Sequence, residues 1–301
     1  MKYKFCLHIG MHKTGSSFLQ KNVFPYFRRM KFWHQPNFNI VRGSKPTSFS
    51  RFMASSPLIW RDLGKQLFDK IKKTDTDVLV SDEHTTLVND PYRISQHVSE
   101  MRRILEPYHE LRVLVVIRRQ DTWFASAYAE TTSEYKEVSQ NHFRRWVEDR
   151  ITPEKKCFSS AGVRVEYHTL IQKLQKVLKN NLLVLPFEML KKDPTSFVEK
   201  CCDYAGRRVP QSISLKPKNK KSLSEKKWRV SSYSRRHIQL RPSRLFHAVL
   251  GRSRIRIPVW GREKEITLTE DLSKLILKRY KTENEKLDRH LNLGLKQYGY
   301  Y

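Results

Sequence analysis

The stretch HIGMHKTGSSFLQ, near the N-terminus, contains residue types that can bind a phosphate-like anion. Four residues separate Gly10 from Gly15, Lys13 lies between the two glycines, and Ser16 and Ser17 follow the second one. A loop that joins a strand to a helix directs backbone N–H groups and the positive end of the helix dipole at one point. Glycine lets the backbone approach an anion closely, while serine and lysine add donors and charge. The stretch therefore predicts a phosphate-binding loop, although a nucleotide-hydrolysing loop would place its lysine directly after the second glycine.

Charged residues follow two other apolar stretches that have the composition of buried strands. Asp82, Glu83 and His84 follow DVLVS, and Arg118 and Arg119 follow LRVLVVI. The carboxyl ends of parallel strands meet at one edge of a sheet, and ligands bind there. We therefore expect the loop, the acidic stretch and the arginines to lie together, although the sequence separates them.

The elements that must position these residues alternate between strand-like and helix-like patterns. Short apolar runs predict strands at 3–9, 77–83, 111–117 and 182–188. Apolar residues at helical spacings predict helices at 15–29, 94–107, from 121 onward and at 167–180. The alternation is typical of the α/β class and predicts three layers, with a central parallel β-sheet flanked by helices.

The C-terminal part of the chain has a different composition. Residues 207–264 contain 18 Lys or Arg and only two acidic residues, within a chain whose formal net charge is +29. We expect a single domain over residues 1–301, in which a basic and mostly helical subregion, 207–301, packs on the sheet; a separate C-terminal domain is the alternative. So positive a surface favours polyanionic partners, namely nucleic acid, an anionic polysaccharide or an anionic membrane surface.

Two helices are predicted within this basic subregion. Ser222 and Glu225 match a helix capping box, which predicts a helix at 222–233. An apolar stripe predicts a second helix at about 270–291.

The cysteines and the hydropathy pattern indicate where the protein acts. Four scattered cysteines give no disulfide framework, which is typical of a reducing compartment. No window of the sequence is long and apolar enough to span a membrane, and the first predicted strand begins at residue 3. We therefore expect a cytoplasmic protein, with peripheral contact at the inner face of the membrane as an option.

The sequence HKTGSSFLQ resembles the 5′-phosphosulfate-binding loop of the sulfotransferases that use 3′-phosphoadenylyl sulfate (PAPS). This resemblance implies a P-loop sulfotransferase fold. It also implies that Lys13, Gly15, Ser16 and Ser17 bind the 5′-phosphate and the sulfuryl group, and that Thr14 contributes backbone contacts.

A second motif, VIRRQDTWFASAY, resembles the segment of the same family that binds the 3′-phosphate of PAPS. The family has an arginine at the end of a strand, a serine eight residues later and a tyrosine two residues after that. Arg118, Ser126 and Tyr128 fit this spacing, although Arg119 leaves the register open. Gln120 stands where many members have proline, and the Arg-Gln-Asp sequence resembles bacterial carbohydrate-type members.

Two further motifs resemble the family more weakly. LPFEMLKKDP, at 185–194, is similar to a strand that is followed by an Asp-Pro turn. NKKSLS, at 219–224, is similar to the basic segment that folds over the 3′-phosphate, which implies contacts from Lys220 and Ser222. An ordinary strand-to-helix turn and an ordinary helix cap explain these two motifs equally well.

The chemistry implied by the resemblance is sulfuryl transfer to a hydroxyl group, which leaves adenosine 3′,5′-bisphosphate. Positioning and charge stabilisation dominate such transfers, and Lys13 is placed to neutralise the leaving phosphate. This chemistry requires no metal, and His8 and His12 flank the loop without forming a metal cluster. The acceptor hydroxyl needs a base, for which Glu83 is favoured over His84; the alternative is that Glu83 only caps the next helix.

The acceptor is expected to be a carbohydrate or a glycolipid, and the basic stretch at 207–264 favours an anionic one. Two other functions remain open from the sequence. A P-loop kinase or NTPase would use ATP and Mg²⁺, with the acidic end of VLVSDE as the metal site. A non-enzymatic protein could bind nucleic acid through its basic region, but we expect no specific nucleic-acid partner.

Overall fold

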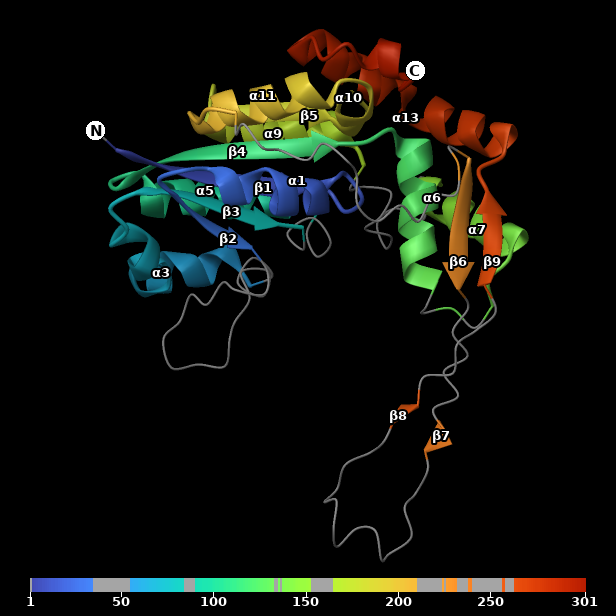
Figure 1. Cartoon of the computed structure of the whole chain (residues 1–301), viewed down its shortest axis with the longest axis horizontal. Helices are drawn as coiled ribbons and strands as arrows, with labels where there is room; N and C mark the ends of the chain where they lie inside the picture. The colour runs from blue at the N-terminus through green and yellow to red at the C-terminus, as the bar shows by residue number, and fades with distance from the viewer. Residues whose placement is uncertain are drawn as a thin grey trace, which may run out of the picture.

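A five-stranded parallel sheet forms the centre of the computed structural model (Figure 1). The structure describes residues 2–34, 55–83, 90–132, 135, 137–152, 165–209, 224, 226–231, 238–239, 256–257 and 263–301. The strand order is β2-β3-β1-β4-β5. The strands are β1 (Tyr3–Gly10), β2 (Met30–His34), β3 (Asp77–Asp82), β4 (His109–Ile117) and β5 (Leu182–Pro186). This arrangement confirms the predicted α/β class with a central parallel sheet, and it adds β2, an edge strand that was not predicted.

Helices cover both faces of the sheet because successive strand residues point to opposite sides. On one face, Phe5, Leu7 and Ile9 of β1 belong to the same apolar core as α3 (Pro57–Lys72), α5 (Pro91–Leu105) and α9 (Tyr167–Leu178). On the other face, Cys6 belongs to a second core, with α1 (Ser16–Asn22) and α11 (Pro194–Ala205). The remaining helices are η1 (Phe24–Tyr26), α6 (Gln120–Thr131), α7 (Gln140–Ile151), α10 (Phe187–Lys192), α13 (Glu270–Leu291) and η4 (Leu295–Tyr298).

The register of the parallel strands aligns their carboxyl ends. Ile9 lies opposite Asp82 of β3, and Gly10 lies opposite Val116 of β4. The loop after β1, the acidic stretch after β3 and the arginines after β4 therefore leave the sheet at one edge, as expected.

The first predicted helix, 15–29, is shorter in the structure. Helix α1 ends at Asn22, and a 3-10 turn over Phe24–Tyr26 follows it. Pro25 lies inside this turn, and a proline has no N–H for the helical hydrogen-bond ladder and disfavours helical backbone before it. The prediction therefore overran the helix by about two turns.

The helix predicted at 222–233 is wrong, because the described part of this stretch includes a strand. Strand β6 (Lys227–Ser231) pairs antiparallel with β9 (Glu263–Thr267). Trp228 and Val230 are buried while Lys227 and Arg229 are exposed, which is the two-residue period of a half-buried strand. A second short pair joins β7 (Ile238–Gln239) to β8 (Arg256–Ile257).

Helix α13 packs on α6, α7 and α9, beyond the carboxyl edge of the sheet (Figure 1). Its buried residues Leu272, Ile276, Tyr280 and Leu287 belong to the same core as α5 and α9. The single-domain organisation stays a prediction, which this shared core supports. None of the described helices combines the length and the apolar character that crossing a membrane requires.

Candidate active site

The loop between β1 and α1 turns tightly over Met11–Gly15. The backbone N–H of Thr14 donates to the carbonyl of Met11 at 3.1 Å, and the Thr14 hydroxyl donates to the same carbonyl. Lys13 and Gly15 both have left-handed backbone conformations, with φ of 67° and 86°. Such a conformation is unfavourable for a lysine, so contacts from other elements must hold it in place.

Gly10, at the end of β1, lets three polar side chains converge because it has no side chain of its own. A Cβ atom there would lie 2.2 Å from the Ser16 hydroxyl oxygen, 3.0 Å from Glu83 Cγ and 3.2 Å from Cε1 of His8. The Ser16 hydroxyl is buried and lacks a hydrogen-bond partner among the residues that the structure describes. A buried donor of this kind, at the start of a helix, suits an oxygen atom of a phosphate or phosphosulfate group. Ser17, by contrast, is exposed.

Arg118, directly after β4, lies against the loop and is only 7% exposed. Its Nη1 donates to the carbonyl of Lys13 at 2.7 Å, and its Nε donates to the Thr122 hydroxyl at 3.1 Å. The guanidinium carbon lies 5.0 Å from the centroid of the Phe187 ring. Arg118 therefore supports the left-handed backbone of Lys13 and places a second positive charge next to the loop.

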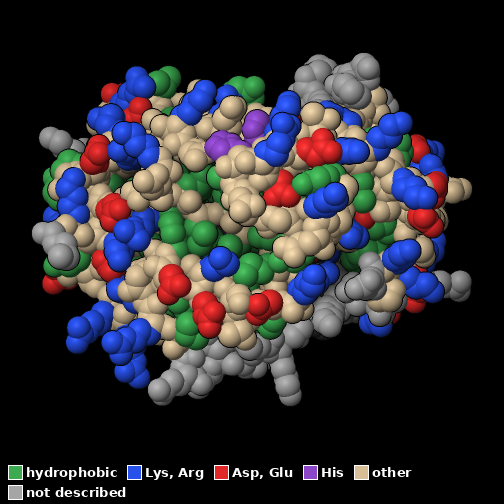
Figure 2. Space-filling model, turned by 90° about the horizontal axis from the view of Figure 1, so that it is seen from above, with side chains coloured by type: hydrophobic (Ala, Val, Ile, Leu, Met, Phe, Trp, Pro, Cys, Tyr) green, Lys and Arg blue, Asp and Glu red, His purple; other side chains and the backbone are tan. Residues whose placement is uncertain are grey.

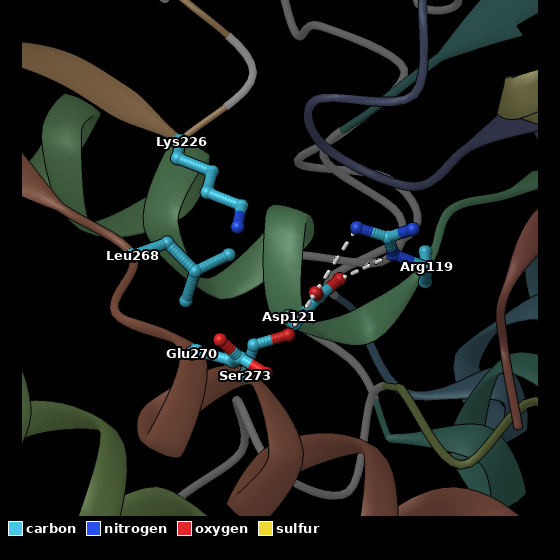
Figure 3. Close-up of a pocket in the computed structure, with 6 residues that line it drawn as sticks. All are labelled: Arg119, Asp121, Lys226, Leu268, Glu270 and Ser273. Carbon is cyan, nitrogen blue, oxygen red and sulfur yellow. Dashed lines mark hydrogen bonds and ion pairs between the residues drawn. The ribbon is translucent and has the colours of Figure 1, made fainter.

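Arg119 points toward Asp121, at the rim of a small cavity (Figure 3). Its Nε and Nη2 donate to the two carboxylate oxygens of Asp121 at 2.8 and 3.1 Å, and the Ser273 hydroxyl donates to the same carboxylate at 2.6 Å. The cavity is lined by Arg119, Asp121, Lys226, Leu268, Glu270 and Ser273. Since Arg119 already forms a bidentate ion pair, the geometry favours Arg118 as the arginine that serves the loop.

One face of α6 lies against the loop. Trp123 Nε1 donates to the carbonyl of His12 at 2.7 Å, and Glu130 contacts the side chains of His12 and Lys13. Ser126 lies three residues after Trp123 and four before Glu130, so it belongs to the same face. Tyr128 belongs to another face, where it is fully buried and its hydroxyl is hydrogen-bonded to His142 Nδ1 at 2.8 Å.

Four ionisable side chains form a chain of contacts over the loop. The Glu130 carboxylate contacts both His12 Nε2 and Lys13 Nζ. On the other side of the same imidazole, His12 Nδ1 lies 3.6 Å from Glu83 Oε2. The sequence predicted Lys13 and Glu83 but missed Glu130. Its spacing of four residues from Ser126, on a predicted helix, was the signal that could have found it.

The cluster changes the protonation of its members. Burial lowers the pKa of His12, but hydrogen bonds to Glu130 and Glu83 outweigh burial and raise it above its usual value. Burial raises the pKa of Glu130, but hydrogen bonds from His12 and Lys13 outweigh it and hold the pKa at about 2. Burial lowers the pKa of His8 to about 4, so this imidazole is neutral at physiological pH. The ion pair of Lys13 and Glu130 therefore lies on one side of the loop, and the neutral imidazole of His8 lies on the other.

The start of α6 is fixed by hydrogen bonds from C-terminal elements. The side-chain amides of Gln120 and Asn284 are hydrogen-bonded to each other twice, at 2.8 and 3.0 Å, and Asn284 also donates to the carbonyl of Tyr300 at 3.0 Å. Glu188 accepts from the backbone N–H of Arg119 at 3.2 Å and from the Tyr300 hydroxyl at 2.7 Å. Gln120 stands at the position where the resembled family motif often has proline, and in this structure its side chain has a hydrogen-bonding partner on α13.

Three predicted site residues, His84, Lys220 and Ser222, lie outside the described residues. The remaining ones are Lys13, Thr14, Gly15, Ser16, Ser17, Glu83, Arg118 and Ser126. The first seven lie on the loop or directly beside it, and Ser126 belongs to the face of α6 from which Trp123 and Glu130 contact the loop. We therefore place the candidate active site at the loop and not at the cavity beside Asp121, which none of these eight residues lines.

The solved structures that are similar to this chain include the following three, whose TM-scores are below 0.5. A sulfotransferase from Alicyclobacillus acidocaldarius is 15% identical, with 73% of this chain and 87% of that chain covered and a TM-score of 0.48. The mouse sulfotransferase SULT7A1, complexed with PAP, is 9% identical, with 70% and 62% covered and a TM-score of 0.41. The sulfotransferase domain from the curacin biosynthetic pathway is 11% identical, with 70% and 76% covered and a TM-score of 0.36.

A comparison with curated protein sequences finds no match. The model of the sulfotransferase domain family, however, matches residues 6–240, which is most of the chain and includes the loop, the acidic stretch and both arginines. The match also decides against the kinase alternative. The chain belongs to the sulfotransferase domain family.

Proposed function

We propose that this sulfotransferase moves a sulfuryl group from PAPS to a hydroxyl of a carbohydrate or glycolipid acceptor. The observation that carries the proposal is the contact between Arg118 Nη1 and the carbonyl of Lys13, at 2.7 Å. It joins the loop that suits a 5′-phosphosulfate to the arginine that suits a 3′-phosphate. A ligand with anionic groups at both ends of its ribose fits such a pair of sites, whereas ATP has no 3′-phosphate.

The loop residues would bind the 5′ end of PAPS. The buried, unpartnered Ser16 hydroxyl and the positive φ of Gly15 fit an oxygen-rich group held close to the backbone. Lys13 adds an ammonium group, Ser17 an exposed hydroxyl, and Thr14 keeps the loop in its turn. No bound metal is needed for these residues to neutralise a phosphosulfate.

Arg118 and Ser126 would bind the 3′-phosphate. Arg118 provides a fixed charge, and Ser126 lies on the loop-facing side of α6. Lys220 and Ser222 are proposed to close over the same phosphate, as the family resemblance implies.

PAPS supplies the reactive sulfuryl group when it is bound. Lys13 then neutralises charge on the leaving phosphate, because its ammonium group extends from the loop itself. Glu83 is the proposed base for the proton of the acceptor hydroxyl, and the position of its side chain beside Gly10 and Ser16 supports this role. His84 is the alternative base.

The acceptor is proposed to be anionic. The excess of 59 Lys and Arg over 30 Asp and Glu favours such a ligand over a neutral one. Figure 2 shows Lys and Arg side chains spread over one face of the molecule, with acidic side chains between them. We propose that the protein acts in the cytoplasm, where a glycolipid acceptor would bring it to the inner face of the membrane.

Ligand-induced thermal stabilisation tests the proposed cofactor. We expect adenosine 3′,5′-bisphosphate to raise the melting temperature equally with and without EDTA, because binding to the native state stabilises it. Adenosine 5′-phosphate, which lacks the 3′ group, should stabilise less. If ATP with Mg²⁺ stabilises the protein and the bisphosphate does not, the proposed cofactor is wrong.

A further inference from the structure

Glu130 occupies a place that neither the proposed chemistry nor the family motifs use. It lies in the last turn of α6, on the same face as Trp123 and Ser126. A single oxygen atom, Oε2, contacts both His12 Nε2 and Lys13 Nζ. Its side chain is 35% exposed, and that of Lys13 is 23% exposed, so the ion pair lies at the mouth of the site and not in the core.

Lys13 cannot keep this contact and also serve a phosphosulfate fully. An ammonium group has three donors, but a direct ion pair with Glu130 places its charge on a carboxylate instead of on the ligand. An anionic ligand that approaches the loop also meets the negative charge of Glu130. Both effects oppose binding. A move of Lys13 from Glu130 to the ligand ends the first effect, but the negative charge of Glu130 remains and needs another partner.

His12 gives Glu130 a second partner that does not depend on Lys13. The imidazole lies between Glu130 and Glu83, and these two carboxylates and Lys13 are the charged groups that act on it. The carboxylates raise the pKa of His12, so His12 gains a proton more readily than a free imidazole. Glu130 therefore keeps a hydrogen-bonded partner after Lys13 has left it.

We infer that Glu130 is the counter-ion of Lys13 in the empty enzyme, and that the 5′-phosphate group of the ligand displaces it. Glu130 is then a positioning residue: it holds the Lys13 side chain over the loop before the ligand arrives, and it competes with the ligand for the same ammonium group. This inference rests on the proposed function, because it concerns the same loop.

Replacing Glu130 by Gln removes the charge but keeps the shape and the ability to accept from His12. We expect Glu130→Gln to lower the Kd for adenosine 3′,5′-bisphosphate about fivefold, the value of one partly exposed ion pair. Isothermal titration calorimetry measures this change. Glu130→Asp keeps the charge and should show no such gain, which separates the effect of charge from that of side-chain shape.

A matched control is Glu100→Gln on α5. Glu100 also accepts from two cationic side chains, Arg61 and Arg103, each at 2.8 Å, but it lies on a helix that flanks another part of the sheet. This control should bind the bisphosphate as the unmodified protein does, and thermal unfolding checks that each variant is folded.

The Lys13→Met background tests whether the effect passes through Lys13. There, Glu130→Gln should lower the Kd clearly less than it does in the unmodified background, because no ammonium group is left to release and only the direct repulsion between Glu130 and the ligand is removed. A gain of the same size in both backgrounds, or a Kd for Glu130→Gln that equals that of the unmodified protein, overturns the inference. If the unmodified, folded protein binds no bisphosphate at all, the proposed function itself fails, and the inference fails with it.

Discussion

Glu83 and His12 show how the site combines groups that are distant in sequence. Glu83 follows β3, whose last residue lies opposite Ile9, so the parallel register carries the carboxylate to the loop. There it lies 3.6 Å from the His12 imidazole, which Glu130 contacts from the other side. If Glu83 is the base, as we propose, it has an imidazole and a lysine close by, and these groups suit a sulfuryl transfer to a hydroxyl.

Glu83→Gln is expected to separate catalysis from binding. The amide keeps the shape of the side chain but cannot act as a base, so kcat should fall roughly 10²-fold or more while bisphosphate binding stays close to normal. Steady-state kinetics at saturating PAPS, together with calorimetry, measures the two effects.

His84→Ala is the comparison for this variant, because His84 is the alternative base. It should reduce kcat much less than Glu83→Gln does. If Glu83→Gln keeps most of the activity and a folded His84→Ala protein has none, then His84 is the base and the role given to Glu83 is wrong.

At the scale of residues, the motifs marked candidate site residues that follow the ends of strands. Lys13 and Arg118 have fixed sequence positions relative to a strand, and the structure places both at the loop. Glu130 was missed because its one mark in the sequence, the spacing of four residues from Ser126, identifies a helix face but not what packs against that face. Only the packing of α6 against the loop brings its carboxylate to Lys13. Tyr128 fits the family spacing but is a buried core residue.

At the scale of elements, the position of α6 decides the geometry of the site. Arg118 precedes this helix directly, and Ser126 and Glu130 both lie on it. The start of α6 is held by the buried pair Gln120–Asn284, in which both side chains are 0% exposed. Asn284 belongs to α13, so a C-terminal helix holds α6 in place at the edge of the sheet where the candidate site lies.

Asn284→Ala is expected to destabilise the protein. The substitution removes three hydrogen bonds and leaves the buried Gln120 amide with fewer partners, which should lower the free energy of unfolding by about 2 kcal/mol. Urea unfolding measures this value. Asn141→Ala, at an exposed position of α7, is the control and should stay within about 0.5 kcal/mol of the unmodified protein. Equal stability of the two variants would show that the amide pair does not hold α6.

Elements were predictable from the sequence where one physical signal dominated. The strands β1, β3, β4 and β5 have apolar runs buried by helices on both sides, so their composition identifies them. Strand β6 was predicted as a helix because a local capping pattern precedes it. Its pairing with β9, more than thirty residues later, determines its conformation instead.

At the scale of the whole molecule, the excess of basic over acidic residues is a property of the entire chain, and the fold does not explain it. Described acidic side chains are engaged in ion pairs with lysines and arginines on many elements, including α3, α5, α7 and α13. The whole chain has 59 Lys and Arg but only 30 Asp and Glu, so the acidic side chains are too few to pair one-to-one with the basic ones. The long-range field of such a surface acts on any anionic acceptor before contact.

The response to salt tests whether this field recruits the acceptor. Mobile ions screen charges over about 10 Å at 0.1 M ionic strength and about 3 Å at 1 M, so raising the salt concentration weakens long-range attraction but leaves contacts inside the site largely intact. With PAPS kept saturating, we therefore expect the KM for an anionic polysaccharide or glycolipid acceptor to rise with salt while kcat changes little. A neutral acceptor of the same sugar type is the control, and its KM should stay nearly constant. If the KM for the anionic acceptor does not change with salt, the basic surface does not contribute to acceptor binding. The charge of the protein would then no longer be an argument for an anionic acceptor.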